Sequence, residues 1–264
     1  MIRVGIGGWT FAPWRGTFYP KGLAQTRELQ HASRHLTSIE INGTFYSTQK
    51  PASFRKWAAE TPDDFLFSLK GSRYVTHRRV LAEAGESITR FLASGLTELG
   101  DKLGPILWQL HPGKRFEPED FEAFLALLPP DLEGRPLRHA VEVRHESFVD
   151  PAFVALLNKY GVAPVLVHSD KHPLIADITA DFVYCRLQRT SEKNVAGYPP
   201  RELDAWAKRA KTWATGGEPA DLPSIAAKSP KAAGRDVFLY VIHEGKVRAP
   251  AAAMALIERL NARG

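Results

Sequence analysis

The chain has 264 residues, of which 44% are hydrophobic and 24% are charged. These fractions are typical of a globular protein, so they exclude the disordered, collagen-like and coiled-coil classes. Lysine and arginine outnumber aspartate and glutamate by 35 to 29, and the resulting net charge of +6 would favour the approach of an anionic substrate or a nucleic acid.

The cysteine content and the hydropathy pattern indicate the cellular compartment to expect for this protein. The single cysteine, Cys185, excludes a disulfide framework and a multi-cysteine zinc site, and it fits a reducing compartment. No stretch reaches 18 apolar residues, and Met1 is followed directly by a strand-like segment instead of a signal peptide. We therefore expect a cytoplasmic protein without a membrane partner. The sequence leaves its oligomeric state open.

Eight short apolar segments predict strands, at residues 2–6, 37–41, 65–69, 106–110, 139–143, 163–167, 182–187 and 236–242. Segments with helical periodicity lie between most of them, at residues 26–35, 51–60, 86–99, 118–128, 151–160, 201–214 and 249–261. Pro118, Pro151 and Pro200 are expected at the first position of their helices. Thr26 and Asp150 are expected to be N-caps.

Alternating strands and helices predict parallel strands that are joined by right-handed crossovers. Eight such units fit a TIM (β/α)8 barrel, an α/β fold of roughly 250 residues, as a single domain over residues 1–264. A doubly wound open sheet is the alternative, but residues 5–9 lack its glycine-rich phosphate-binding turn. Helix six should be short, around residues 173–178. Residues 215–235 should form an exposed excursion before strand eight.

Polar residues gather near the C-terminal ends of these strands. Because side chains alternate along a strand, each strand has an apolar set that is expected under the helices and a set that is expected inside the barrel. The inward sets are Ser38, Glu40 and Asn42; Leu66, Ser68 and Lys70; Leu107, Gln109 and His111; Ala140, Glu142 and Arg144; Leu166, His168 and Asp170; and Tyr184, Arg186 and Gln188. Barrel enzymes carry their active sites at this end, so a polar site is predicted there. The alternative is a polar plug that only holds the barrel together.

The charges in the inward sets favour a chemistry without metal. Three acidic residues balance three basic residues: Glu40, Glu142 and Asp170 against Lys70, Arg144 and Arg186. A divalent-metal site normally has an excess of carboxylate and histidine. We therefore favour the interpretation that the protein is an enzyme without a cofactor, which binds a small polar or anionic ligand through the three basic residues. Glu40 or Glu142 would act as general acid or base, and Lys70 would stabilise developing charge.

Two other functions fit parts of the sequence. A metal-dependent phosphoesterase or nuclease would need a divalent metal, with candidate ligands Glu40, His111, Glu142, His145, His168, Asp170, His243 and Glu244. A nucleic-acid-binding protein without catalysis would use the basic residues Arg73, Arg78, Arg79, Lys208, Arg209 and Lys211, with the first-loop aromatic residues Trp9, Phe11, Trp14, Phe18 and Tyr19. The simpler interpretations are a solvated helix face and a packed lid.

Several ordered motifs resemble one known family. They are Gly7-Gly8-Trp9, residues 14–20, residues 38–46, Thr61-Pro62 with residues 65–70, Thr76-His77, residues 103–105, residues 109–112, residues 142–145 and residues 179–186. Together they resemble the domain of unknown function 72 family, also called YecE-like, over nearly the whole chain. The resemblance implies a TIM barrel and supplies no established reaction. This chain departs from the family at Gln188-Arg189, where His-Gly is usual, and after Tyr240, where the run reads Val241-Ile242-His243-Glu244.

The resemblance and the strand pattern together give the predicted site. The family's recurring polar motifs fall on Glu40, Asn42, Tyr46, Lys70, His77, Gln109, Glu142, Arg144, His145 and Arg186. The residues predicted to be catalytic are Glu40, Lys70 and Glu142. The residues predicted to bind substrate are Asn42, Tyr46, His77, Gln109, Arg144, His145, Arg186, Asp170 and Trp9. No residue is predicted as a metal ligand of this site.

Overall fold

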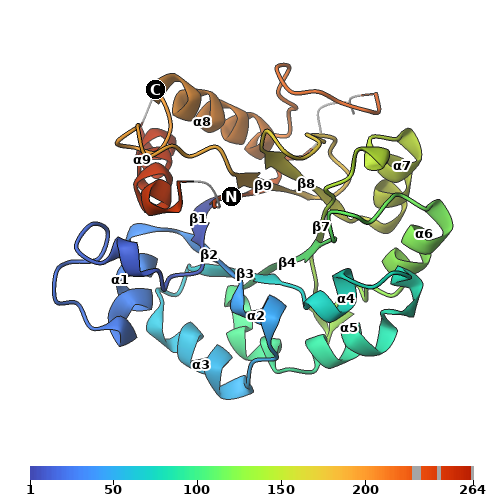
Figure 1. The fold of residues 1–264 in the computed structure, drawn as a ribbon, viewed down its shortest axis with the longest axis horizontal. Helices are drawn as coiled ribbons and strands as arrows, with labels where there is room; N and C mark the ends of the chain where they lie inside the picture. The colour runs from blue at the N-terminus through green and yellow to red at the C-terminus, as the bar shows by residue number, and fades with distance from the viewer. Residues whose placement is uncertain (228–232, 243–244, 263–264) are drawn as a thin grey trace.

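Eight parallel strands form a closed barrel in the order β1-β10-β9-β8-β7-β4-β3-β2 (Figure 1). The computed structural model describes residues 1–227, 233–242 and 245–262. The strands of the barrel are β1 (Ile2–Gly7), β2 (Ser38–Ile41), β3 (Leu66–Lys70), β4 (Leu103–Gln109), β7 (His139–Glu142), β8 (Ala163–His168), β9 (Phe182–Leu187) and β10 (Asp236–Val241). All eight predicted strands are present, and the predicted single-domain TIM barrel is confirmed.

The main helices lie outside the ring of strands (Figure 1). They are α1 (Glu28–His35), α3 (Pro51–Glu60), α5 (Gly85–Leu92), α6 (Pro118–Ala126), α7 (Pro151–Tyr160), α8 (Pro200–Ala214) and α9 (Ala249–Asn261). The three prolines that were predicted at helix starts begin α6, α7 and α8. Asp150 caps α7, because its carboxylate accepts a hydrogen bond of 2.7 Å from the backbone nitrogen of Ala152. Among the described residues, no helix is long and apolar enough to cross a membrane.

Two predictions about helix ends are wrong. Thr26 is not an N-cap, because it lies inside a 3-10 turn (Gln25–Arg27) that runs directly into α1. The segment 86–99 is not one helix, because Gly95 has a φ of 95° and separates α5 from a 3-10 stretch (Leu96–Lys102). Such a left-handed conformation suits glycine and ends the right-handed turn.

The predicted short helix six is absent. Residues 173–178, between β8 and β9, have no regular structure. Tertiary hydrogen bonds hold this stretch instead of helical ones: the Asp177 carboxylate accepts from the backbone nitrogens of Ile225 and Ala226, and the Thr179 hydroxyl donates to the Val162 carbonyl. The partners of Asp177 belong to the excursion before β10, which forms no helix or strand in its described residues 215–227 and 233–235. This excursion is not fully exposed, because Leu222 is buried.

Two short strands and two short α-helices were not predicted. Two-residue strands β5 (Asp131–Leu132) and β6 (Arg135–Pro136) form a small hairpin before β7. Helices α2 (Gly43–Tyr46) and α4 (Arg73–Thr76) directly follow β2 and β3. They are single turns, too short to show the periodicity of an amphipathic helix. Both lie at the C-terminal end of the barrel, where the polar site was predicted.

The apolar core has an outer and an inner layer. The outer layer lies between strands and helices and includes Ile39, Trp108 and Cys185. The inner layer fills the barrel below its C-terminal end and contains Leu107, Ala140, Ala163, Val165, Val167, Phe182, Tyr184, Phe238, Tyr240 and Ile242. Large aromatic side chains therefore close the interior, where the Tyr240 hydroxyl bonds to the hydroxyls of Ser38 and Ser68 at 2.7 and 2.6 Å. The buried charged residues Glu40, Lys70, Glu142 and Arg186 lie nearer the C-terminal mouth.

We expect Gly5→Ala to lower the free energy of unfolding by about 2 kcal/mol or more, because β1 and β2 approach closely at this residue. An added Cβ would lie 2.0 Å from the backbone oxygen of Ser38. The matched control is Gly85→Ala, whose nearest neighbour would be a Leu127 side-chain carbon at 3.6 Å. Thermal unfolding measures both variants. Equal melting temperatures for the two would contradict the close approach.

Candidate functional site

The polar mouth of the barrel is built around Arg186 of β9. Its Nε and Nη2 donate to the Glu40 carboxylate at 3.1 and 3.0 Å, and its Nη1 donates to Glu142 Oε2. Glu40 comes from β2 and Glu142 from β7, so one guanidinium joins three strands across the interior. The Tyr184 hydroxyl also donates to Glu40, at 2.8 Å. A buried charge is tolerated when it is paired and hydrogen-bonded in this way.

Glu142 is fully buried and all its acceptor atoms are in use. Its Oε1 accepts from Gln109 Nε2 at 2.9 Å and from Arg144 Nε at 2.8 Å, and its Oε2 accepts from Arg186. Burial opposes ionisation of this carboxyl, but Arg186 and Arg144 outweigh it and lower the pKa of Glu142 to about 2. Glu142 is therefore ionised at neutral pH, and its carboxylate holds the two arginines in place.

Lys70, at the end of β3, differs from the arginines because no described carboxylate lies within ion-pair distance of it. Its Nζ lies 4.0 Å from the centre of the Phe45 ring, and the side chain is largely buried. Burial, followed by repulsion from Arg186, lowers the pKa of Lys70 to about 8. Lys70 is thus a cation whose charge is only weakly compensated, with a proton that is easily removed near neutral pH.

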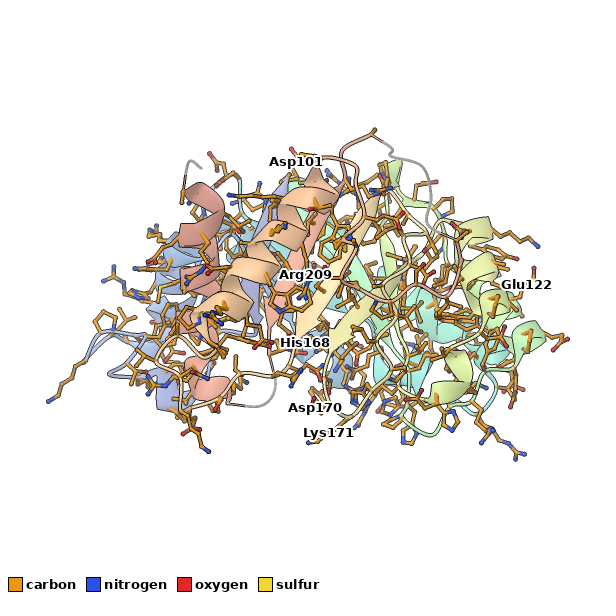
Figure 2. The ribbon with its side chains drawn as sticks, turned by 90° about the horizontal axis from the view of Figure 1, so that it is seen from above. Asp101, Glu122, His168, Asp170, Lys171 and Arg209 are labelled. Carbon is orange, nitrogen blue, oxygen red and sulfur yellow. The ribbon has the colours of Figure 1, made fainter. Side chains whose placement is uncertain are left out.

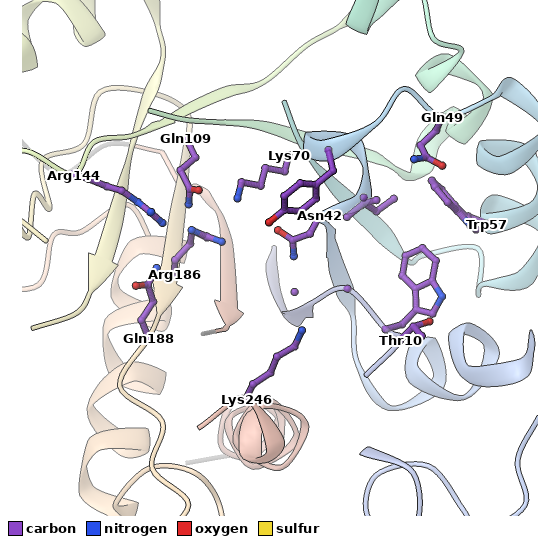
Figure 3. Close-up of a pocket in the computed structure, with 16 residues that line it drawn as sticks. Thr10, Asn42, Gln49, Trp57, Lys70, Gln109, Arg144, Arg186, Gln188 and Lys246 are labelled. Carbon is purple, nitrogen blue, oxygen red and sulfur yellow. The ribbon is translucent and has the colours of Figure 1, made fainter. Parts of the chain in front are cut away.

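A cavity of about 640 Å³ opens above this network (Figure 3). Its described lining is Gly7, Gly8, Trp9, Thr10, Ile41, Asn42, Gly43, Tyr46, Gln49, Trp57, Lys70, Gln109, Arg144, Arg186, Gln188 and Lys246. Four of these side chains are cationic and none is acidic. Trp9 and Trp57, with ring centres 5.3 Å apart, form an apolar wall. The cavity therefore suits a small anion with an apolar or ring-shaped part.

The structure brings most of the predicted site residues together. Seven of the twelve line the cavity: Trp9, Asn42, Tyr46, Lys70, Gln109, Arg144 and Arg186. Glu40 and Glu142 lie beneath it and face the arginines instead of the open space. Their predicted catalytic roles stay predictions, and the observed contacts are those of positioning residues. His77, His145 and Asp170 do not line the cavity.

The inward direction predicted for β8 is wrong. Val165 and Val167 belong to the inner layer, and Leu166 lies in the outer one. Figure 2 shows His168 close to helix α8, with Asp170 beyond it at the end of the strand. The His168 ring packs 5.0 Å from the Trp206 ring, and burial lowers the pKa of His168 to about 4. The strand is apolar on both faces, so its last residues were a poor guide to its orientation.

Asp170 is therefore removed from the predicted pocket. Its exposed carboxylate lies 3.2 Å from the Arg189 guanidinium, outside the barrel mouth.

The two other predicted histidines make local contacts. His145 Nδ1 accepts from the Ser147 backbone nitrogen at 3.1 Å and starts a 3-10 turn (Glu146–Phe148). His77 is exposed and packs edge to face against Phe45, whose ring in turn faces Lys70. His77 thus contacts a residue that borders Lys70 and does not itself line the cavity.

Sequence reasoning missed several lining residues because they come from outside the strands. Lys246 follows β10 and reaches the cavity from the last loop, where burial lowers its pKa. Trp57 comes from α3 and Gln49 from the segment before it. No period-two pattern identifies such residues. Gln188 was placed in an inward set but was not included in the predicted site.

The residues needed for a metal centre are spread apart in the described part of the chain. It contains no group of three or more His, Cys, Asp or Glu side chains that could hold a metal ion. Glu40 and Glu142 are engaged by arginines, and the Nδ1 of His111 accepts from the Gly113 backbone at 3.0 Å. The candidates His243 and Glu244 lie outside the described residues.

Four of the five first-loop aromatic residues, Phe11, Trp14, Phe18 and Tyr19, pack against one another, and Trp9 lines the cavity instead. Trp14 and Tyr19 are fully buried, and the Trp14 ring packs against Phe11 and Phe18 with centres 5.2 and 6.3 Å apart. Trp14 and Tyr19 therefore have no exposed ring face on which a base could stack. On α8, Arg209 pairs with Asp221 at 2.8 Å. Nucleic-acid binding stays a prediction.

We expect Glu142→Gln to lower the free energy of unfolding by about 3 kcal/mol at pH 7, because it leaves Arg186 without part of its counter-charge. The folded pKa of Glu142 is about 2 and its ordinary value is 4.5. The stabilisation of the folded state by the ionised Glu142 carboxylate is therefore complete above pH 4.5 and is lost as the pH falls toward 2. Urea unfolding at pH 7 and pH 3 tests this, with exposed Glu83→Gln as control. A wild-type advantage of equal size at both pH values would contradict the assignment.

Comparison with known proteins agrees with the fold and the motifs. The family model described as protein of unknown function DUF72 matches residues 3–264. The UPF0759 protein YecE of Escherichia coli K12 is 29% identical over 151 residues, which cover 56% of this chain and 50% of that protein, so the match spans half of its length. YunF of Bacillus subtilis strain 168, also a UPF0759 protein, is 27% identical over 215 residues, which cover 79% of this chain and 73% of YunF.

The crystal structure of a DUF72 family protein from Thermotoga maritima superposes with a TM-score of 0.76 at 22% identity, covering 99% of this chain and all of that one. The resemblance inferred from the motifs is thus confirmed, and the chain belongs to the DUF72 family.

Proposed function

We propose that this protein is an enzyme that binds a small anionic substrate in the cavity at the C-terminal face of the barrel and acts on it by acid–base chemistry through Lys70. The observation that carries the proposal is the charge of the cavity wall. It presents Lys70, Arg144, Arg186 and Lys246, and no acidic side chain among its described lining residues. Such a wall favours a carboxylate or phosphate group.

The arginines and the lysines have different roles in this proposal. Arg144 and Arg186 are held rigidly by Glu142, so they present fixed hydrogen-bond donors to an anion without reorganising. Glu40 and Glu142 act through these arginines and do not contact substrate. Lys70 has no such partner and is the group that remains available to react.

Proton exchange by Lys70 follows from its environment. A pKa of about 8 makes both the ammonium and the amine accessible near neutral pH. The ammonium can donate a proton to a developing oxyanion, and the amine can accept one from the substrate. Arg144 and Arg186 would stabilise negative charge that develops on a bound acid, whether Lys70 donates or accepts the proton.

Ligand screening followed by turnover tests the proposal. Carboxylate and phosphate metabolites are screened by thermal shift, since a ligand of the folded state raises its melting temperature. Each hit is then incubated with the protein in deuterium oxide, and nuclear magnetic resonance follows deuterium incorporation or product. We expect wild type to turn over at least one hit and Lys70→Met to lose about 100-fold or more in rate. If Lys70→Met turns over the same hit at the wild-type rate, the proposed chemistry is wrong.

Lys70→Met is expected to stabilise the empty protein and to weaken anion binding. A pKa lowered from 10.5 to about 8 means that burial of the charge costs on the order of 3 kcal/mol at pH 7. Removal of the charge should recover part of this cost, while affinity for sulfate should fall about tenfold or more. Thermal shift with a sulfate titration measures both effects. The control is Lys21→Met, which removes a positive charge from an exposed side chain. Its melting temperature and its response to sulfate should equal those of wild type, because both proteins share any general effect of salt on stability.

Sulfate affinity should also depend on pH with the titration of Lys70. The ammonium form predominates below its pKa of about 8, so binding should be constant from pH 6 to 7 and should weaken as the pH rises through 8 to 9. Sulfate itself stays doubly charged over this range. Calorimetry at each pH measures the affinity. Lys70→Arg keeps its charge and should show no such decrease, and a similar decrease in that variant would assign the titration to another group.

A further inference from the structure

The amide of Gln188 is an unpaired polar group in the wall of the cavity. The side chain is 2% exposed, and neither Nε2 nor Oε1 has a hydrogen-bond partner in the described part of the structure. Burial of an amide without a partner is unfavourable, and such groups in native proteins normally have a partner that the protein, water or a ligand supplies. Gln188 lines the cavity, and a rotation of its side chain would bring the enclosed amide to a bound ligand, which can be that partner.

The position of Gln188 relates it to the anion site. It follows Arg186 by two residues, so both side chains point to the same side of β9. Figure 3 shows the Gln188 amide beside the Arg186 guanidinium, on the side of the cavity that also holds Arg144 and Gln109. An acidic group that is bound by Arg186 would thus lie next to this amide.

The chemistry of an amide then restricts the ligand. The NH2 group donates hydrogen bonds and the carbonyl oxygen accepts them. A carboxylate or a fully ionised phosphate only accepts hydrogen bonds, so it would satisfy Nε2 and leave Oε1 unpaired. A hydroxyl on the carbon next to the acidic group supplies the missing donor, and the two ligand groups together match both ends of the amide.

We propose that the anion bound in this cavity carries a hydroxyl beside its acidic group, and that Gln188 selects this pair. This inference rests on the proposed anion site and adds the substrate class, hydroxy acids. Arg186 and Lys70 provide the attraction to the charge, and Gln188 distinguishes the hydroxylated anion from the plain one. Sites with a buried polar group that needs a hydroxyl discriminate strongly against the analogue that lacks it.

Two matched pairs of acids test the selection. Malate is compared with succinate, and lactate with propionate, by calorimetry on wild type, Gln188→Met and the control Gln25→Met, which changes an exposed glutamine. We expect wild type and Gln25→Met to bind the hydroxylated member of a pair about tenfold more tightly. Gln188→Met should bind both members of a pair equally, with the affinity for the plain acid retained.

The outcomes separate this inference from the proposed function. If wild type binds neither sulfate nor any of the four acids, the anion site itself is overturned. If it binds sulfate and none of the four acids, the anion site stands and the hydroxy-acid class is overturned. If they bind and wild type shows no preference for the hydroxylated members, or Gln188→Met keeps that preference, only the selection by Gln188 is overturned.

The stability of the empty protein gives a second readout. Gln188→Met should raise its melting temperature by about 2 °C or more, since an unpaired buried amide is removed. A decrease would show that the amide is bonded within the protein, and would overturn its role in recognition.

Discussion

The site depends on one buried interaction, the contact of the Arg186 guanidinium with the carboxylates of Glu40 and Glu142. It joins β2, β7 and β9, which are not all neighbours in the barrel. Glu142 also accepts from Arg144, so the two carboxylates beneath the cavity are engaged by the arginines of its wall, and neither lies within ion-pair distance of Lys70. The four cations of the cavity wall thus face only two carboxylates in this network, which leaves the wall with an excess of positive charge. The aromatic inner layer closes the barrel below the network.

The two residues that are best placed to act on a ligand, Lys70 and Gln188, have unfavourable surroundings in the empty protein. Arg144 is bonded to Glu142, whereas Lys70 lacks a described carboxylate partner and the Gln188 amide lacks a described hydrogen bond. Natural proteins keep such unfavourable groups where a ligand completes them. A bound substrate would therefore have to supply a negative charge for Lys70 and hydrogen bonds for the Gln188 amide.

The sequence was sufficient for the architecture and for most of the mouth of the barrel. Apolar runs located the eight strands, and alternation placed Glu40, Lys70, Glu142 and Arg186 on the inner side. Alternation failed on β8 because its segment is apolar on both faces, and the outward contact of His168 with Trp206 depends on where α8 packs. The hydrogen-bond partners of these residues could not be predicted from the sequence either. Alternation shows that two glutamates and two arginines meet, but not that hydrogen bonds occupy all the carboxylate oxygens of both glutamates. Lys246 was missed for a similar reason, since its position comes from the tertiary path of the last loop.

The two ends of the chain are joined at this site. Strand β1 pairs with β10, and the indole nitrogen of Trp14 donates to the backbone oxygen of Lys246, 232 residues away. During synthesis the first strand therefore keeps an open edge until β10 has left the ribosome. A nascent or shortened chain that lacks β10 and Lys246 cannot close the barrel or finish the cavity wall. Assembly of the binding site and completion of the fold are thus a single late event.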